Sequence, residues 1–178
     1  MKLLIHRDIR SFRQLFGAFR ECVTLVGGVM IILGAAMGFT SWLVDAMIPE
    51  LFLDWVQAHV ESRWLFLLGL NVFLLFAGSV MEIFAAIIVV VPLLAPLGVA
   101  YGIHPVHLAI IFIANLELGY LTPPVGLNLF LTSYRLRRPL TEVYRAALPY
   151  LVLGGIGVLL ITYLPWLTLW LVEAVGQQ

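Results

Sequence analysis

The stretch Gly119-Tyr120-Leu121-Thr122-Pro123-Pro124-Val125-Gly126 lies inside an apolar segment that runs from Leu108 to Ser133. The segment is long enough to cross a bilayer as one helix. Two adjacent prolines prevent a single helix, because each lacks an N–H to donate and its ring clashes with the carbonyl four residues back. We therefore expect one helix to stop before the double proline and another to start after it.

The same residues predict how the second helix begins. The residue before a proline leaves the α region, so we expect Thr122 to cap a new helix that starts at Pro123. The carbonyls of Gly119 and Tyr120 would then lose their partners. In lipid, such a break occurs only where it lines a protein cavity. It offers carbonyl oxygens to a cation and a helix N-terminus to an anion, as in many secondary transporters.

Composition places this break in a membrane protein. Hydrophobic residues make up 62% of the 178 residues and charged residues 11%, whereas soluble domains hold about half and about a quarter. Between residues 64 and 134 the only Asp, Glu, Lys or Arg side chains are those of Glu82 and Glu117. The net charge of zero indicates no nucleic-acid partner. With no phosphate loop, serine elbow or zinc-protease pattern, we expect no enzyme activity.

Uncharged apolar runs of about 20 residues predict membrane spans. The expected parts are a basic amphipathic segment on the cytoplasmic membrane surface at 1–21, a membrane domain at 22–172 and a tail at 173–178. The alternative for the first part is a solvated linker. The expected spans are 23–44, 64–81, 83–100, 108–133 with a break at 120–124, and 147–171. The first span carries glycines that favour close packing against another helix, namely Gly27, Gly28, Gly34 and Gly38.

Lysine and arginine predict the orientation. Residues 1–21 contain five of them and residues 134–145 contain four, whereas residues 45–63 contain one. By the positive-inside rule the N-terminus is cytoplasmic and the C-terminus periplasmic. Residues 1–20 lack the continuous apolar core of a signal peptide, so we expect no such leader in them.

Residues 64–100 fit two arrangements. They form two full spans, or a re-entrant hairpin with its tip near Gly78 and Ser79 that enters and leaves on the external side. We favour the hairpin, because Gly, Ser and Glu suit a tip buried in protein better than a loop at the opposite face. The tip carries Glu82, which is expected to bind a cation, to carry a proton, or to accept hydrogen bonds from backbone N–H groups as a structural residue.

A family resemblance rests on residues 115–130, Asn-Leu-Glu-Leu-Gly-Tyr-Leu-Thr-Pro-Pro-Val-Gly-Leu-Asn-Leu-Phe. This run resembles the large membrane subunit of tripartite ATP-independent periplasmic (TRAP) transporters, and the resemblance covers roughly residues 20–172. Further segments resemble the same subunit, namely Gly102–His107, Pro139-Leu140, Arg145-Ala146-Ala147, Pro149-Tyr150, Met81-Glu82 and Pro92–Pro96.

The resemblance implies an all-α integral membrane protein, namely the second inverted repeat of an elevator-type transporter with a re-entrant helical hairpin and a broken transmembrane helix. It implies a sodium-coupled importer of small organic carboxylates, such as C4-dicarboxylates or sialic acids, in the bacterial inner membrane. The implied partners are the first-half repeat of the large subunit, a small membrane subunit, a periplasmic substrate-binding protein and the lipid bilayer, with sodium as the coupling ion and no cofactor. The alternatives are a truncated remnant or scaffold that does not transport, and another ion-coupled transporter with inverted repeats.

The resemblance also implies the site residues. Those implied to form the sodium site are Gly119, Thr122, Pro123, Pro124, Val125 and Gly126, with Gly78 and Glu82 from the hairpin. Those implied to face the substrate are Thr122, Asn128 and Ser79. No Lys or Arg occurs in residues 64–134, so a basic residue that holds the substrate is expected from the missing half. His104 and His107 complete no metal-ligand set, and Asn71 is expected to bond between helices.

Overall fold

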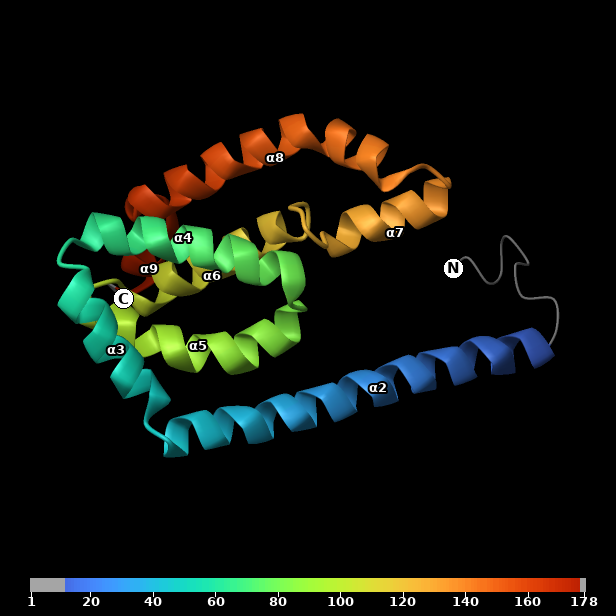
Figure 1. Cartoon of the computed structure of the whole chain (residues 1–178), viewed down its shortest axis with the longest axis horizontal. Coiled ribbons are helices and arrows are strands. Elements are labelled where there is room, and N and C mark those ends of the chain that lie inside the picture. Colours follow the sequence, from blue (N-terminus) through green and yellow to red (C-terminus); the bar gives the residue numbers. More distant parts are fainter. Residues whose placement is uncertain (1–11, 177–178) are drawn as a thin grey trace.

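The computed structural model describes residues 12–176, and in this range every regular element is a helix. Figure 1 shows the helices as an elongated bundle in which most helices run along the long axis. The helices are α2 (Phe12–Asp45), α3 (Ile48–His59), α4 (Arg63–Val80), α5 (Ile83–Ala100), α6 (Pro105–Gly119), α7 (Leu127–Leu136), α8 (Leu140–Tyr163) and α9 (Trp166–Gly176). The all-α prediction is confirmed for this range.

Among the described residues, four helices are long and apolar enough to cross a membrane, namely α2, α4, α5 and α8. With 24 residues, α8 is about 36 Å long at 1.5 Å per residue, compared with about 30 Å for the hydrocarbon core of a bilayer. By the same rise, α6 and α7 together measure about 37 Å. Both pack against α8, so the broken segment and α8 form an antiparallel pair of matching length (Figure 1).

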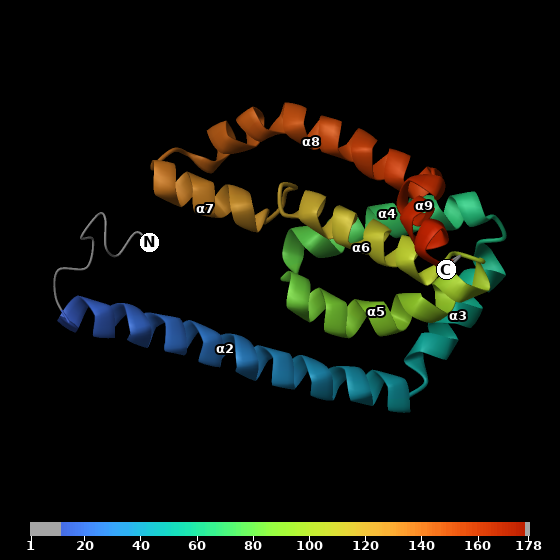
Figure 2. The same cartoon turned by 180° about the vertical axis from the view of Figure 1, so that it is seen from behind.

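The core lies between α4, α5 and α6, and α3 covers one end of it. The side chains of Leu74, Ala86, Ile111 and Leu116 are completely buried there. The helices α4 and α5 form a hairpin whose two arms meet at Met81 and Glu82. In both views the tip of this hairpin lies level with the break between α6 and α7, short of the α7–α8 turn (Figures 1 and 2).

Charge is divided between the two ends of the bundle. The first turns of α2 and the α7–α8 turn lie at one end, and α3 lies at the other (Figure 2). The two regions that the sequence groups as basic therefore share an end, as far as residues 12–176 describe them. The opposite end carries acidic side chains, namely Asp45, Glu50, Asp54 and Glu61.

Two predicted boundaries differ from the structure. No separate surface segment ends at residue 21, because α2 continues from Phe12 to Asp45 without a proline to stop it; residues 1–11 lie outside the described range. The last expected span, 147–171, is displaced, because α8 already begins at Leu140 and ends at Tyr163. Pro165 then follows, and since it has no N–H for the ladder of α8, a separate helix α9 begins.

A hydrogen bond between a side chain and the backbone joins α2 to α5. Pro92 lies inside α5 and has no N–H, so the carbonyl of Ile88 has no helical partner. The Thr40 hydroxyl of α2 donates to this carbonyl at 3.0 Å. Thr40 thus replaces the donor that Pro92 lacks.

Candidate functional site

The apolar segment is broken where the sequence predicts. The helix α6 ends at Gly119, α7 begins at Leu127, and turns fill the space between them. The predicted cap is wrong, because the residue that caps α7 is Gly126 and not Thr122. The N–H of Thr122 donates to the Gly119 carbonyl at 2.8 Å, and its hydroxyl donates to the Leu118 carbonyl at 2.9 Å. Thr122 therefore completes the end of α6, so Pro123 does not start a helix.

Gly126 has a positive φ of 52°, which glycine adopts at little steric cost. A Cβ atom at this position would lie 3.1 Å from the Thr122 carbonyl oxygen and 3.3 Å from that of Tyr120. The two oxygens therefore lie beside the Gly126 backbone, close to each other in space. A side chain at residue 126 would crowd both of them.

The break leaves carbonyl oxygens without hydrogen-bond donors. The Gly119 carbonyl accepts from Thr122, so the prediction that it would be free is wrong. Within residues 12–176, no hydrogen bond reaches the carbonyls of Tyr120, Leu121, Thr122 and Pro123. Unwound backbone carbonyls of this kind coordinate coupling cations in secondary transporters.

The hairpin tip packs directly against the break. The N–H of Gly126 donates to the Ser79 carbonyl in a long hydrogen bond of 3.4 Å. A Cβ on Gly78 would lie 2.8 Å from the Cα of Leu116, and one on Gly119 would lie 2.6 Å from the carbonyl carbon of Gly78. Real Cβ atoms do not approach backbone this closely. Glycine at both positions therefore lets the two backbones touch.

Glu82 caps α5. Its Oε2 atom accepts from the N–H of Phe84 at 3.0 Å and from that of Ala85 at 3.4 Å. A carboxylate in this position stabilises a helix start through hydrogen bonds and the helix dipole. The structure thus shows the role of backbone acceptor, and the sodium-ligand role of Glu82 stays a prediction. Glu117 is exposed on α6.

The three residues predicted to face the substrate differ in accessibility. Asn128 is exposed in the first turn of α7, and Thr122 is half-buried with oxygen lone pairs still available. Ser79 is only 3% exposed, and its hydroxyl donates to the Phe76 carbonyl at 2.7 Å. Within the described chain, Thr122 and Asn128 are accessible at the break. Ser79, in the last turn of α4, is buried where α4 packs against the break.

Tyr144 is a site residue that the sequence analysis missed. Its hydroxyl on α8 lies 3.1 Å from the Pro124 carbonyl and 3.4 Å from the Val125 carbonyl. It thereby ties the second half of the break to α8 through these two carbonyls. No motif marks this residue, which stands in the charged sequence between the break and the last span.

A buried polar network lies beside the site, in the core. The side-chain amide of Asn115 on α6 donates to the Asn71 oxygen on α4 at 2.7 Å, and the Thr162 hydroxyl on α8 lies 3.0 Å from the same oxygen. The prediction that Asn71 bonds between helices is confirmed. His107 extends the network, since its ring nitrogens lie 2.7 Å from the Thr168 hydroxyl and 3.2 Å from the Thr162 carbonyl. His104 caps α6 by accepting from the N–H of Val106.

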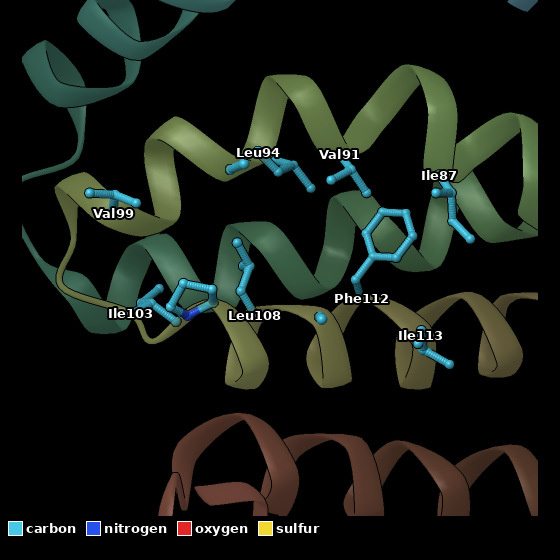
Figure 3. Close-up of a pocket in the computed structure, with 11 residues that line it drawn as sticks. Ile87, Val91, Leu94, Val99, Ile103, Leu108, Phe112 and Ile113 are labelled. Carbon is cyan, nitrogen blue, oxygen red and sulfur yellow. The ribbon is translucent and has the colours of Figure 1, made fainter. Parts of the chain in front are cut away.

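A separate cavity of about 340 Å³ lies between α5 and α6. Figure 3 shows Val91, Leu94 and Phe112 projecting into it from the two helices. Its lining side chains are apolar, so they offer nothing that would hold a cation or a carboxylate. The break is therefore the better candidate for both.

The comparisons identify the family. The model of the tripartite ATP-independent periplasmic transporter, DctM component, matches residues 1–167. The chain belongs to the DctM family. It is 38% identical over 176 residues to the C4-dicarboxylate TRAP transporter large permease protein DctM of Pseudomonas aeruginosa, an alignment that covers 99% of this chain and 41% of that protein.

Two further relatives differ in the substrates that their names state. The sialic acid TRAP transporter large permease protein SiaM of Vibrio cholerae is 36% identical over 140 residues, with 77% of this chain and 33% of that protein covered. A putative dicarboxylate transporter subunit of Paracoccus pantotrophus is 34% identical over 161 residues, with 90% and 77% covered. The chain spans about 40% of the length of several of the large permeases that it matches.

Proposed function

We propose that this DctM-family chain forms one repeat of a sodium-coupled secondary importer for small organic carboxylates. The observation that carries the proposal is the packing of the hairpin tip on the α6–α7 break, where Gly78 meets Gly119 and the Ser79 carbonyl bonds to Gly126. This packing gathers carbonyls and a helix start in one place. Both are needed for a cation and a carboxylate to bind side by side.

The sodium ion would be held mainly by backbone oxygens. The carbonyls of Tyr120 and Thr122 lie beside Gly126 and accept no hydrogen bond within residues 12–176. The Thr122 hydroxyl donates to Leu118 and keeps lone pairs that can coordinate. Of the eight residues implied by the family resemblance, Thr122 thus has the strongest geometric support.

The substrate carboxylate would lie at the start of α7. The cap residue Gly126 makes no side-chain hydrogen bond to this helix, so no capping side chain competes with an anion there, and the helix dipole favours negative charge at this end. Asn128 is exposed in the same turn. The basic residue that would complete the anion site is expected from the first-half repeat, since residues 64–134 contain no Lys or Arg.

The arrangement of the helices supports a re-entrant hairpin. The tip of α4–α5 stops level with the break, whereas α7 continues to the end of the bundle where the basic residues gather (Figure 1). With that end in the cytoplasm, the hairpin enters from the periplasmic side of the inner membrane and turns near mid-depth. The C-terminal helix α9 then lies on the periplasmic side, and the first-half repeat, a small membrane subunit and a periplasmic binding protein complete the transporter.

The test is uptake by cells that express this chain together with a first-half repeat from a relative. We expect sodium-dependent uptake of a C4-dicarboxylate or of sialic acid, and its loss when Pro123 and Pro124 are both replaced by alanine, because α6 can then continue into α7. Pro149→Ala is the matched control, since Pro149 lies inside the unbroken helix α8. Uptake that survives the double substitution, or that never depends on sodium, would contradict the mechanism and favour another kind of transporter. No uptake with the unaltered chain would contradict the proposal and favour a remnant that does not transport.

A further inference from the structure

The turn between α7 and α8 has an uneven distribution of charge. Arg135 lies in the last turn of α7, Arg137 and Arg138 lie in the connection itself, and Arg145 lies in the second turn of α8. Arg138 pairs with Glu142 at 3.6 Å. The other three arginines have no ion pair within residues 12–176, which leaves an excess of positive charge at this end of the bundle.

Two of these arginines share a hollow. Arg135 and Arg137 line it together with Ser133 and Tyr134. All but Ser133 are exposed. An arginine presents several N–H donors in a fork that matches a phosphate. The hollow therefore offers donors from two arginines and a tyrosine hydroxyl to a single anionic group.

The backbone of the turn is held in one shape. Arg137 has a positive φ of 51°, which is uncommon for a residue other than glycine. The N–H groups of Arg137 and Arg138 both donate to the Ser133 carbonyl, and the Ser133 hydroxyl donates to the Arg138 carbonyl at 2.7 Å. These bonds fix the directions in which residues 135 and 137 leave the backbone. An ordered turn loses less entropy when it binds a ligand.

Apolar and aromatic surface adjoins the hollow. Tyr134 is 81% exposed and Leu136 is 64% exposed, although both flank charged residues in a turn. Tyrosine is enriched where a membrane protein meets the headgroups, and arginine side chains near helix ends reach toward that layer. The same end of the molecule carries the first turns of α2 (Figure 2), so this level of the bundle suits a membrane surface.

We propose that the hollow formed by Ser133, Tyr134, Arg135 and Arg137 binds the phosphate headgroup of an anionic lipid such as phosphatidylglycerol. The two arginines bind the phosphate, and Tyr134 and Leu136 lie against the glycerol and upper acyl region. Arg138, which Glu142 already neutralises in part, contributes little. The proposal needs only that this turn lies at a membrane surface, and it does not depend on the sodium-coupled transport proposed above.

The test uses the whole chain in phosphatidylcholine nanodiscs that contain spin-labelled phosphatidylglycerol. Electron paramagnetic resonance gives its association with the protein relative to spin-labelled phosphatidylcholine. In the variant Arg135→Gln with Arg137→Gly we expect this preference to fall about tenfold, since each basic residue near an anionic surface contributes measurably. Glycine at residue 137 suits the positive φ, and circular dichroism checks that helix content is unchanged.

The matched control is Arg138→Gln with Arg145→Gln, which removes the same charge from the same end. We expect this control to change the preference less than about twofold. Equal losses in the two double variants would show a diffuse effect of charge and overturn the proposal, as would no loss in the first variant. Inorganic phosphate added at the same concentration as the lipid is expected not to compete, and displacement by it would overturn the assignment to a lipid headgroup.

Discussion

The hairpin–break contact and α2 are both rich in glycine, but they use it differently. Gly78 and Gly119 bring two backbones so close that a Cβ on either would lie less than 3.0 Å from a neighbouring backbone atom. In α2, by contrast, a Cβ on Gly27, Gly28, Gly34 or Gly38 would meet nothing within 4 Å. Small residues therefore mark a close contact at the break, whereas on α2 they mark a surface that the described chain leaves open.

Gly119→Ala is expected to lower the free energy of unfolding more than Tyr144→Phe or Thr40→Val. The new Cβ would lie 2.6 Å from the backbone of Gly78, and backbone cannot rotate away as a side chain can. We expect the free energy of unfolding to fall by about 1–3 kcal/mol, the usual range for overpacking. Unfolding in mixed micelles by titration with dodecyl sulfate measures it.

The control for this variant is Gly28→Ala in α2. Alanine has room there and favours a helix over glycine by about 0.5–1 kcal/mol, so we expect no loss of stability. If both variants lost stability equally, the glycines of α2 would be packed after all. If neither did, the hairpin would not rest on the break.

Tyr144→Phe tests the contact between the break and α8, on the side away from the hairpin tip. The substitution removes the hydroxyl that lies 3.1 Å from the Pro124 carbonyl and keeps the ring. A hydrogen bond of this kind contributes about 0.5–1.5 kcal/mol to the free energy of unfolding, and we expect a loss in that range in the same titration. Tyr134→Phe is the control, because this exposed tyrosine makes no hydrogen bond within the described residues. Indistinguishable stabilities for the two variants would remove Tyr144 from the site.

Thr40→Val tests the contact between α2 and α5. We expect it to change the free energy of unfolding less than Gly119→Ala or Tyr144→Phe. The Ile88 carbonyl would lose the donor that replaces the missing N–H of Pro92. We expect a loss of up to about 1 kcal/mol in the free energy of unfolding and a wider spread of distances between spin labels on α2 and α5. Thr24→Val is the matched control, since the Thr24 hydroxyl bonds to Arg20 within α2 itself. Unchanged label distances for Thr40→Val would show that α2 is held by other contacts.

The sequence predicted the break because a double proline acts locally. Adjacent residues alone prevent the helix, so the end of α6 near Gly119 follows from steric rules. The restart was misplaced by four residues, since Thr122 bonds back to α6 and Gly126, with its positive φ, caps α7 instead. The same kind of local reasoning predicted α4 and α5 as two neighbouring helices. It placed the end of the last span at residue 171, whereas α8 ends at Tyr163.

Contacts across the fold could not be read from one sequence. Tyr144 lies 20 residues from the carbonyl that it contacts, and no spacing rule links the two. The Gly78–Gly119 contact joins residues in different helices, and its glycines look no different in the sequence from those of α2. The role of Glu82 was open for a similar reason, because a carboxylate at a hairpin tip can bind an ion or cap a helix, and the helix start at Ile83 shows that it caps.

The most direct test of the central claim, that the break packed by the hairpin tip binds sodium, is the reactivity of a cysteine at the break. The variant Val125→Cys, in a Cys22→Ser background, places a thiol at an exposed position of the turn. Its rate of reaction with a maleimide is measured in nanodiscs in sodium chloride and in potassium chloride of the same ionic strength. We predict a slower reaction in sodium, and no difference between the salts when Thr122→Val is added. Equal rates in the two salts with Thr122 intact would contradict the account.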